Sequence, residues 1–150
     1  MINSHKELVK EVMNWAEKLE FISDYKYITD INNIDTAINN LASRGFIFGP
    51  IDFAFDEEYN NSVTYGFSII DKTTNDLNAI LTSEQENMFC VSALSDYINR
   101  IQDGDIVFDA MSIDNLESQD GVTTSCSGQF TLNIKRTASY WKIMEQYDAE

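Results

Sequence analysis

The longest regular pattern of hydrophobic and polar positions runs through residues 121–136. Every second position from Val122 to Ile134 is mostly apolar, and the positions between them are all polar. This alternation is typical of a strand that buries one face. We therefore predict a long strand near the end of the chain, whose face of Thr, Ser, Gln and Asn side chains points away from the core.

Two shorter alternating stretches, residues 46–55 and 62–71, flank a polar run. Two strands joined by a polar turn favour an antiparallel hairpin. A further strand is predicted over 105–113, followed by an acidic loop over 114–121 that leads into the final strand. Residues 21–31 have only weak strand character.

Apolar residues at helical spacing predict three helices. The first spans residues 4–19, where Ser4 and Glu7 have the spacing of an N-terminal capping box. A short helix is predicted over 32–45. A long helix over 77–102 measures nearly 40 Å at about 1.5 Å per residue, enough to cross a sheet. Its expected apolar face consists of Leu77, Ile80, Leu81, Met88, Val91, Leu94, Ile98 and Ile101.

This order of elements groups the strands in pairs, which favours the α+β class over alternating βαβ units. We expect an antiparallel or mixed β-sheet of about four to five strands, with the long helix packed across one face and the N-terminal helix as a further element. Residues 1–150 are interpreted as a single domain, because no repeat or linker divides them. Residues 137–150 carry several large apolar side chains and form a candidate interaction tail, with packing on the chain's own sheet as the alternative.

Charge changes the range of functions that the fold can serve. The net charge is −15, from 25 acidic and ten basic residues. Between Asn75 and Ile134 the only base is Arg100, set against ten acids. Such a surface gains nothing from neutralising phosphates, which excludes high-affinity binding of nucleic acid. The acidity is interpreted either as a contribution to solubility or as a surface that stays near DNA without adhering to it.

The sequence contains no recognisable catalytic motif. Its one histidine, His5, lies in the first turn of the N-terminal helix, where we expect a surface residue. Without a second histidine, a nucleophile–histidine arrangement depends on that residue alone. The six glycines match neither a dinucleotide-binding fingerprint nor a phosphate loop. We therefore expect a protein that is not an enzyme and has no catalytic residue, no bound metal and no cofactor.

The remaining candidate chemistry is limited to carboxylates and thiols. No stretch fits a calcium-binding EF-hand loop, so the acidic loop is interpreted as solvated, with an irregular cation site there as the alternative. Cys90 and Cys126 are expected to be buried thiols in a reducing compartment. We see no signal-peptide pattern and no run of the ~20 apolar residues that a membrane helix needs, so we expect folding in a cytoplasm.

After Ser62 a strand ends in the aspartate-containing segment IIDKTTND, and a long helix follows with a late aspartate in ALSDYINRI. A strand, an acidic segment and a glycine then lead into the last long strand, in DNLESQDGVTTSCSGQFTLNIKR. This order of elements resembles that of the neck and tail-completion proteins of tailed bacteriophages, a group that includes tail terminators and head–tail connectors. The resemblance covers residues 62–136, and residues 4–55 fit it more loosely. The chain departs from many members in lacking a tryptophan after the glycine of the last strand.

The resemblance implies a structural virion protein that forms a ring, as a hexamer or dodecamer, at the head–tail junction. Its expected partners are other copies of itself and the neighbouring portal, neck and tail proteins, with DNA passing nearby but not specifically bound and with no membrane. Its expected location is the virion, assembled in the bacterial cytoplasm. The alternative is a soluble acidic α+β adaptor that recognises a basic protein. Candidate interface residues are Glu57, Glu58, Tyr59, Asp114, Glu117, Asp120, Tyr140, Trp141 and Tyr147.

Overall fold

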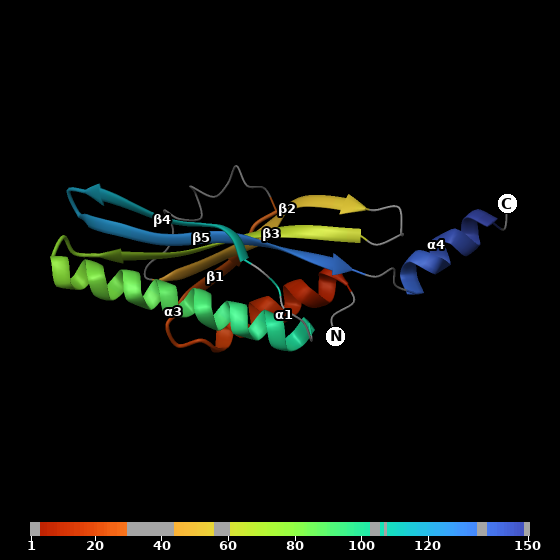
Figure 1. Ribbon diagram of the computed structural model, residues 1–150, viewed down its shortest axis with the longest axis horizontal. Coiled ribbons are helices and arrows are strands. Elements are labelled where there is room, and N and C mark those ends of the chain that lie inside the picture. Colours follow the sequence, from red (N-terminus) through yellow and green to blue (C-terminus); the bar gives the residue numbers. More distant parts are fainter. Residues whose placement is uncertain are drawn as a thin grey trace.

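The structure, a computed structural model, describes residues 4–29, 44–55, 61–102, 106, 108–134 and 138–148. Within them the fold is α+β, with one mixed β-sheet that carries helices on one of its faces (Figure 1). This part of the chain contributes five strands to the sheet, in the order β1-β2-β3-β5-β4. The fold class predicted from the sequence is therefore confirmed.

The sheet is built around two long strands that pair along their whole length. β3 and β5 are antiparallel, with Asn61 opposite Ile134 and Thr73 opposite Val122. β2 and β4 pair with them as the other strands of two antiparallel hairpins, as predicted, whereas the short β1 runs parallel to β2. The strands span β1 Asp24–Tyr27, β2 Gly45–Phe55, β3 Asn61–Thr73, β4 Phe108–Ser118 and β5 Gly121–Ile134.

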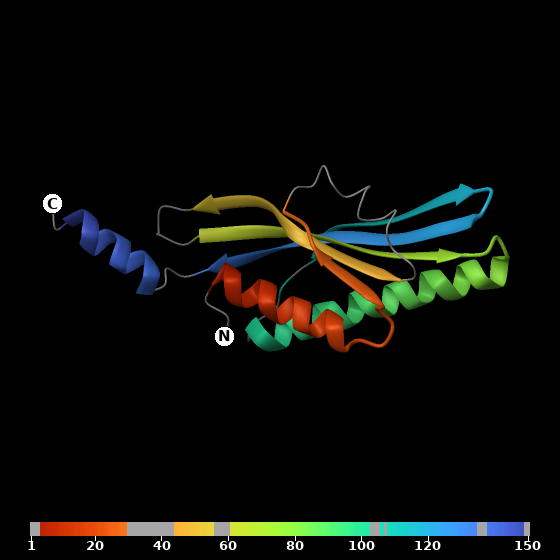
Figure 2. The same ribbon diagram turned by 180° about the vertical axis from the view of Figure 1, so that it is seen from behind.

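Helices α1 (His5–Lys18) and α3 (Leu77–Gln102) lie on the same side of the sheet in both views (Figures 1 and 2). We call this side the helix face and the opposite side the second face. The hydroxyl of Ser4 accepts a hydrogen bond from the backbone N–H of Glu7 at 3.1 Å, which satisfies a free donor of the first turn and begins α1 where the sequence predicts. The third described helix, α4 (Ala138–Asp148), extends beyond the end of the sheet where β5 ends.

The hydrophobic core lies between the sheet and helices α1 and α3. A row of aromatic rings crosses four strands on the helix face, because the alternation of each strand places one ring beside the next. Ring centroids are 5.2 Å apart for Phe48 and Tyr65, 5.4 Å for Tyr65 and Phe130, and 5.0 Å for Phe108 and Phe130. Such offset-stacked pairs add stability beyond their buried area.

The second face carries the polar residues at the odd positions of β5 from 123 to 133, as predicted, and none of these six is fully buried. Hydroxyl pairs link β5 to β3 along this face: Thr64 with Thr131 at 2.8 Å, and Ser68 with Ser127 at 2.7 Å. Cross-strand hydroxyl pairs of this kind stabilise a sheet modestly.

The expected apolar face of α3 is partly wrong. Leu77, Leu81 and Met88 are 71%, 55% and 52% exposed, whereas the buried stripe is Ser83, Asn87, Cys90, Leu94 and Ile98. The first half of α3 is thus turned so that polar side chains face the sheet. The reason is a buried hydrogen-bond network, described below, that satisfies Ser83 and Asn87.

The predicted acidic loop over 114–121 is also wrong, because β4 continues to Ser118 and only Gln119 and Asp120 form the turn. Its Asp, Asn and Ser residues are tolerated because residues 111–118 of this edge strand are all exposed to solvent. Gly121, at φ 140°, adopts a backbone conformation that favours glycine and ends this tight turn. The short helix predicted over 32–45 lies outside the described residues except for Arg44 and Gly45, where β2 begins.

Candidate interaction surface

The acidic candidates that the structure describes lie at one end of the sheet, on the β4–β5 hairpin. Asp114 and Glu117 are exposed on β4, and Asp120 is exposed in the turn. Asp114 and Glu117 are three positions apart, so their side chains leave opposite faces of the strand. They do not converge on a cation, and no group of three metal-binding side chains occurs among the described residues. The hairpin thus presents its carboxylates to solvent on both faces of β4 and in the turn.

β4 forms an edge of the sheet. Within the part of the chain that the structure describes it pairs only with β5, and residues 111–118 are all exposed. An exposed edge strand can accept a strand from another chain, and acidic side chains such as Asp109 and Asp114 limit indiscriminate pairing. The edge therefore favours partners that tolerate or neutralise negative charge.

Three aromatic candidates belong to α4, at the opposite end of the molecule (Figure 1). Tyr147 is 72% exposed and Ile143 is 64% exposed. Tyr140 and Trp141 belong to the same helix, but their side chains lie outside what the structure describes. No described residue of α4 belongs to the hydrophobic core, so packing on the chain's own sheet is not observed. Glu57, Glu58 and Tyr59, between β2 and β3, lie outside the described residues.

An apolar groove runs between α3 and β4. It encloses about 310 Å³ and is lined by Met88, Val91, Ser92, Met111, Ser112, Ile113 and Cys126. Met111 sits above Gly128, where any larger residue would collide with its sulfur and with the ring of Phe67. Sequence reasoning missed this groove because it assigned Met88 to the core. The sequence does contain a signal for this groove: α3 carries more apolar residues than a single buried face of the helix can accommodate.

A second hollow lies on the second face and encloses about 180 Å³. Gly49 and Gly66 are paired across β2 and β3, so neither strand places a side chain there. The backbone of Ile28 passes close above Gly49, where a side chain would collide with its carbonyl. This close approach explains the glycine at position 49, and the small hollow that remains is a consequence of strand packing.

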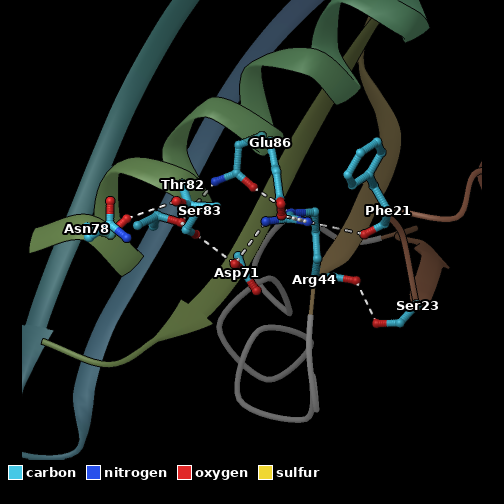
Figure 3. A network of polar contacts seen from close by, with 10 residues as sticks. Phe21, Ser23, Arg44, Asp71, Asn78, Thr82, Ser83 and Glu86 are labelled. Atoms are coloured by element: carbon cyan, nitrogen blue, oxygen red, sulfur yellow. Dashed lines mark hydrogen bonds and ion pairs between the residues drawn. The ribbon is translucent and has the colours of Figure 1, made fainter. Parts of the chain in front are cut away.

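Beneath α3, a buried polar network surrounds Arg44 (Figure 3). Its guanidinium forms ion pairs with Asp71 at 2.9 Å and with Glu86 at 2.7 Å. Its Nε donates to the side-chain oxygen of Asn87 at 2.9 Å. The network thus connects the start of β2 to the end of β3 and to two turns of α3.

Thr124 extends the network to β5. Its hydroxyl accepts a hydrogen bond from the Asn87 amide at 2.9 Å and lies 2.6 Å from the Ser83 hydroxyl. Among the described residues, Gln102 has the one buried side-chain polar atom without a partner, so the network is satisfied. A satisfied buried network fixes the position of α3 and offers no free group to a ligand.

Burial raises the pKa of the Cys90 thiol to about 11, despite the opposing effect of nearby Arg44. Both cysteines are buried and free, as predicted, and burial also raises the pKa of Cys126. Thiols that stay protonated at neutral pH are weak nucleophiles, so we assign Cys90 and Cys126 a role in packing.

Stability should therefore fall at alkaline pH. The unfolded Cys90 thiol ionises near pH 9.0, whereas the folded one stays protonated up to about pH 11. The unfolded state then binds fewer protons, so this contribution is complete below pH 9 and is lost between pH 9 and 11, on the order of 2 kcal/mol. Urea unfolding from pH 8 to 11 measures the loss, and Cys90→Ala should reduce it by about this amount while the buried Cys126 and tyrosines keep their own contributions. An equal loss in the variant would assign the effect to other groups.

His5 is partly buried and is not the surface residue that the sequence suggested. Its Nδ1 lies 2.8 Å from the hydroxyl of the fully buried Tyr65, and its Nε2 accepts or donates at 3.3 Å to the Tyr27 hydroxyl. Burial raises the pKa of Tyr65. His5 thus supplies the hydrogen-bond partner that a buried tyrosine hydroxyl requires, which is a structural role.

None of the described helices is long and apolar enough to cross a membrane. A scan against models of known protein families found no match, and a search of curated proteins found none either.

Proposed function

We propose that this protein is a structural subunit that forms a ring at the head–tail junction of a tailed bacteriophage, as a neck, connector or tail-terminator component. One observation carries the proposal. The acidic β4–β5 hairpin and helix α4, of which no described residue belongs to the core, lie at opposite ends of the molecule (Figure 2). A subunit with different contact surfaces at its two ends associates head to tail, and a repeated head-to-tail contact closes into a ring when the rotation allows it.

The order of elements supports the phage assignment. Two antiparallel hairpins separated by a long helix correspond to the pattern in which the sequence resembles neck and tail-completion proteins. In such a ring the partners are identical copies and the adjoining portal, neck and tail proteins. The location that follows is the virion, assembled in the host cytoplasm.

The charge fits a channel for DNA. Duplex DNA carries one negative charge per ~1.7 Å of helix, and proteins bind it tightly by neutralising phosphates. A subunit with net charge −15 repels the duplex, so a ring of such subunits lets the genome slide through without holding it. We expect no DNA binding at physiological salt.

The test is the mass of the purified protein over a concentration series. Closed rings are expected at about 103 or 205 kDa, six or twelve times the 17.1 kDa chain, with a central hole in negative-stain images. The control is mass spectrometry of purified virions from the phage that encodes the chain. Monomers at every concentration, together with absence from those virions, would overturn the proposal.

An acidic adaptor is the second candidate, and the exposed edge of β4 favours it. Its four carboxylates at positions 109, 114, 117 and 120 have no base among them and suit a basic protein partner. An adaptor stays monomeric and forms a salt-sensitive complex of defined stoichiometry with that partner. Ring formation without any partner distinguishes the structural role from this one.

A further inference from the structure

Helix α3 carries a second stripe beside its buried one, made of four apolar residues and one glutamate. The members are spaced four, three, four and three residues apart, which places them on one side of the helix. They are Leu77, Leu81, Glu84, Met88 and Val91, and we call them the outer stripe. None is fully buried, and Leu77, Leu81 and Met88 are 71%, 55% and 52% exposed. Spacings of four and three are those at which one α-helix packs against another.

The outer stripe continues into the groove between α3 and β4. Met88 and Val91 belong to both, and Met111 and Ile113 of β4 form the opposite wall, where they are 44% and 58% exposed. Methionine side chains adapt to the shape of a partner, and an open apolar groove suits the apolar side of an amphipathic helix. We propose that the outer stripe and this groove together bind a basic amphipathic helix of a partner protein.

The charge of that partner follows from the acids of this surface. Glu84 lies within the outer stripe, where it accepts a hydrogen bond from Asn115 of β4 at 3.4 Å. Glu117 is exposed and pairs with the buried Val122 of β5, on the helix face. The only base in α3, β4 and β5 is Arg100, about 24 Å along α3 from Glu84. A lysine or arginine opposite Glu84 neutralises a carboxylate that the contact otherwise covers without a counter-ion.

The described helices of the chain itself do not fit this surface. Helix α4 carries Lys142 against Glu145 and Asp148, so it is net acidic and does not complement Glu84. Helix α1 already buries its apolar side in the core. The outer stripe of a second copy would bring two Glu84 carboxylates and two chains of net charge −15 together, which is repulsive. The occupant is therefore a helix of a different protein.

A designed peptide tests this inference on the full chain. The probe is a synthetic helix of three heptads, with leucine at the a and d positions, one lysine at the position that faces Glu84, and lysine on both flanks. The control probe carries glutamate in place of every lysine. By fluorescence anisotropy the basic probe should bind about tenfold or more tightly than the acidic one, and salt should weaken it. Equal binding of the two probes, or no binding of the basic probe at millimolar concentration, would overturn the proposal.

Two neighbouring substitutions locate the contact. Met88 and Phe89 are both 52% exposed, but they lie about 100° apart around α3, so only Met88 belongs to the outer stripe. Met88→Asp should weaken the basic probe about tenfold or more, whereas Phe89→Asp should change its affinity less than about twofold. Circular dichroism checks that both variants fold. Equal effects would place the probe elsewhere on the acidic surface, such as the edge of β4, and the proposed contact would be wrong.

A charge exchange tests the role of Glu84 directly. Glu84→Lys should weaken the basic probe, because two positive charges then face each other in the contact. A probe whose central lysine is replaced by glutamate should regain that affinity with Glu84→Lys and lose it with the original protein. If the exchanged pair shows no recovery, Glu84 does not face the helix and the orientation proposed here is wrong.

This inference goes beyond the proposed ring, because it does not require copies of the chain to associate. Particle masses therefore separate the two. If Met88→Asp still forms rings and no longer binds the probe, both proposals are supported. If the original protein binds the probe at the outer stripe but never forms rings, the proposed function fails and this inference stands. If Met88→Asp loses the rings together with the probe, the outer stripe is a contact between copies and the partner proposed here is wrong.

Discussion

Replacing Phe130 with aspartate is expected to leave the protein unfolded at room temperature. Phe130 is fully buried at the centre of the aromatic row and stacks on Tyr65, Phe48 and Phe108. Loss of a buried phenylalanine costs roughly 3–5 kcal/mol, and an unpaired carboxylate in its place adds several more. The sum is comparable with the whole stability of a domain, about 5–15 kcal/mol. Unfolding of the variant is detected as loss of the far-ultraviolet circular dichroism signal and of the cooperative urea transition.

Asn133→Asp is the matched control. It adds the same charge to the same strand but at an exposed position on the second face. Its unfolding free energy should stay within about 1 kcal/mol of the original. If Phe130→Asp folds with a normal transition, the assignment of the two faces of β5 is wrong.

Arg44→Met should cost about 3–5 kcal/mol of stability, the typical result of removing one partner from a buried charge network. The change leaves Asp71 and Glu86 without their counter-ion and Asn87 Oδ1 without its donor. Methionine replaces the aliphatic stem of the arginine, so the lost charge and hydrogen bonds dominate over lost apolar packing. Urea unfolding at pH 7 measures the difference.

Arg100→Met removes the same charge from an exposed position in the last turn of α3 and should cost less than about 1 kcal/mol. A double-mutant cycle with Glu86→Gln isolates the pair, because the glutamine should be less damaging once Arg44 is gone. Equal costs for the two arginine variants would show that the buried network contributes nothing beyond net charge.

The sequence predicted the fold where side-chain alternation and burial agree. β5 alternates without interruption, and its two faces were assigned correctly because a shift by one residue would expose the entire core face. α3 was placed correctly along the chain but turned incorrectly about its axis. Hydrophobicity alone cannot anticipate that Ser83 and Asn87 face the sheet, since their burial depends on Arg44, about forty positions earlier.

The candidate interface was predictable as a set of residues but not as an arrangement. Composition identified Asp114, Glu117 and Tyr147 as exposed groups, and the structure agrees that all three are exposed. Composition could not indicate that the acidic and aromatic groups lie at opposite ends of the molecule, because their separation follows from the order of the strands in the sheet. The groove was missed for the same reason: Met88 and Ile113 become neighbours only when β4 pairs beside β5.

The central position of β3 also has a consequence during synthesis. β3 ends at Thr73, but its partner β5 ends only at Ile134, so a ribosome working at about 5–20 residues per second needs about 3–12 s to supply the second strand. During that interval the apolar side of β3 has only the earlier elements and α3 to cover it. Chains released before β5 is complete therefore expose a strand edge at the middle of the future sheet, and nascent-chain quality control becomes a determinant of yield.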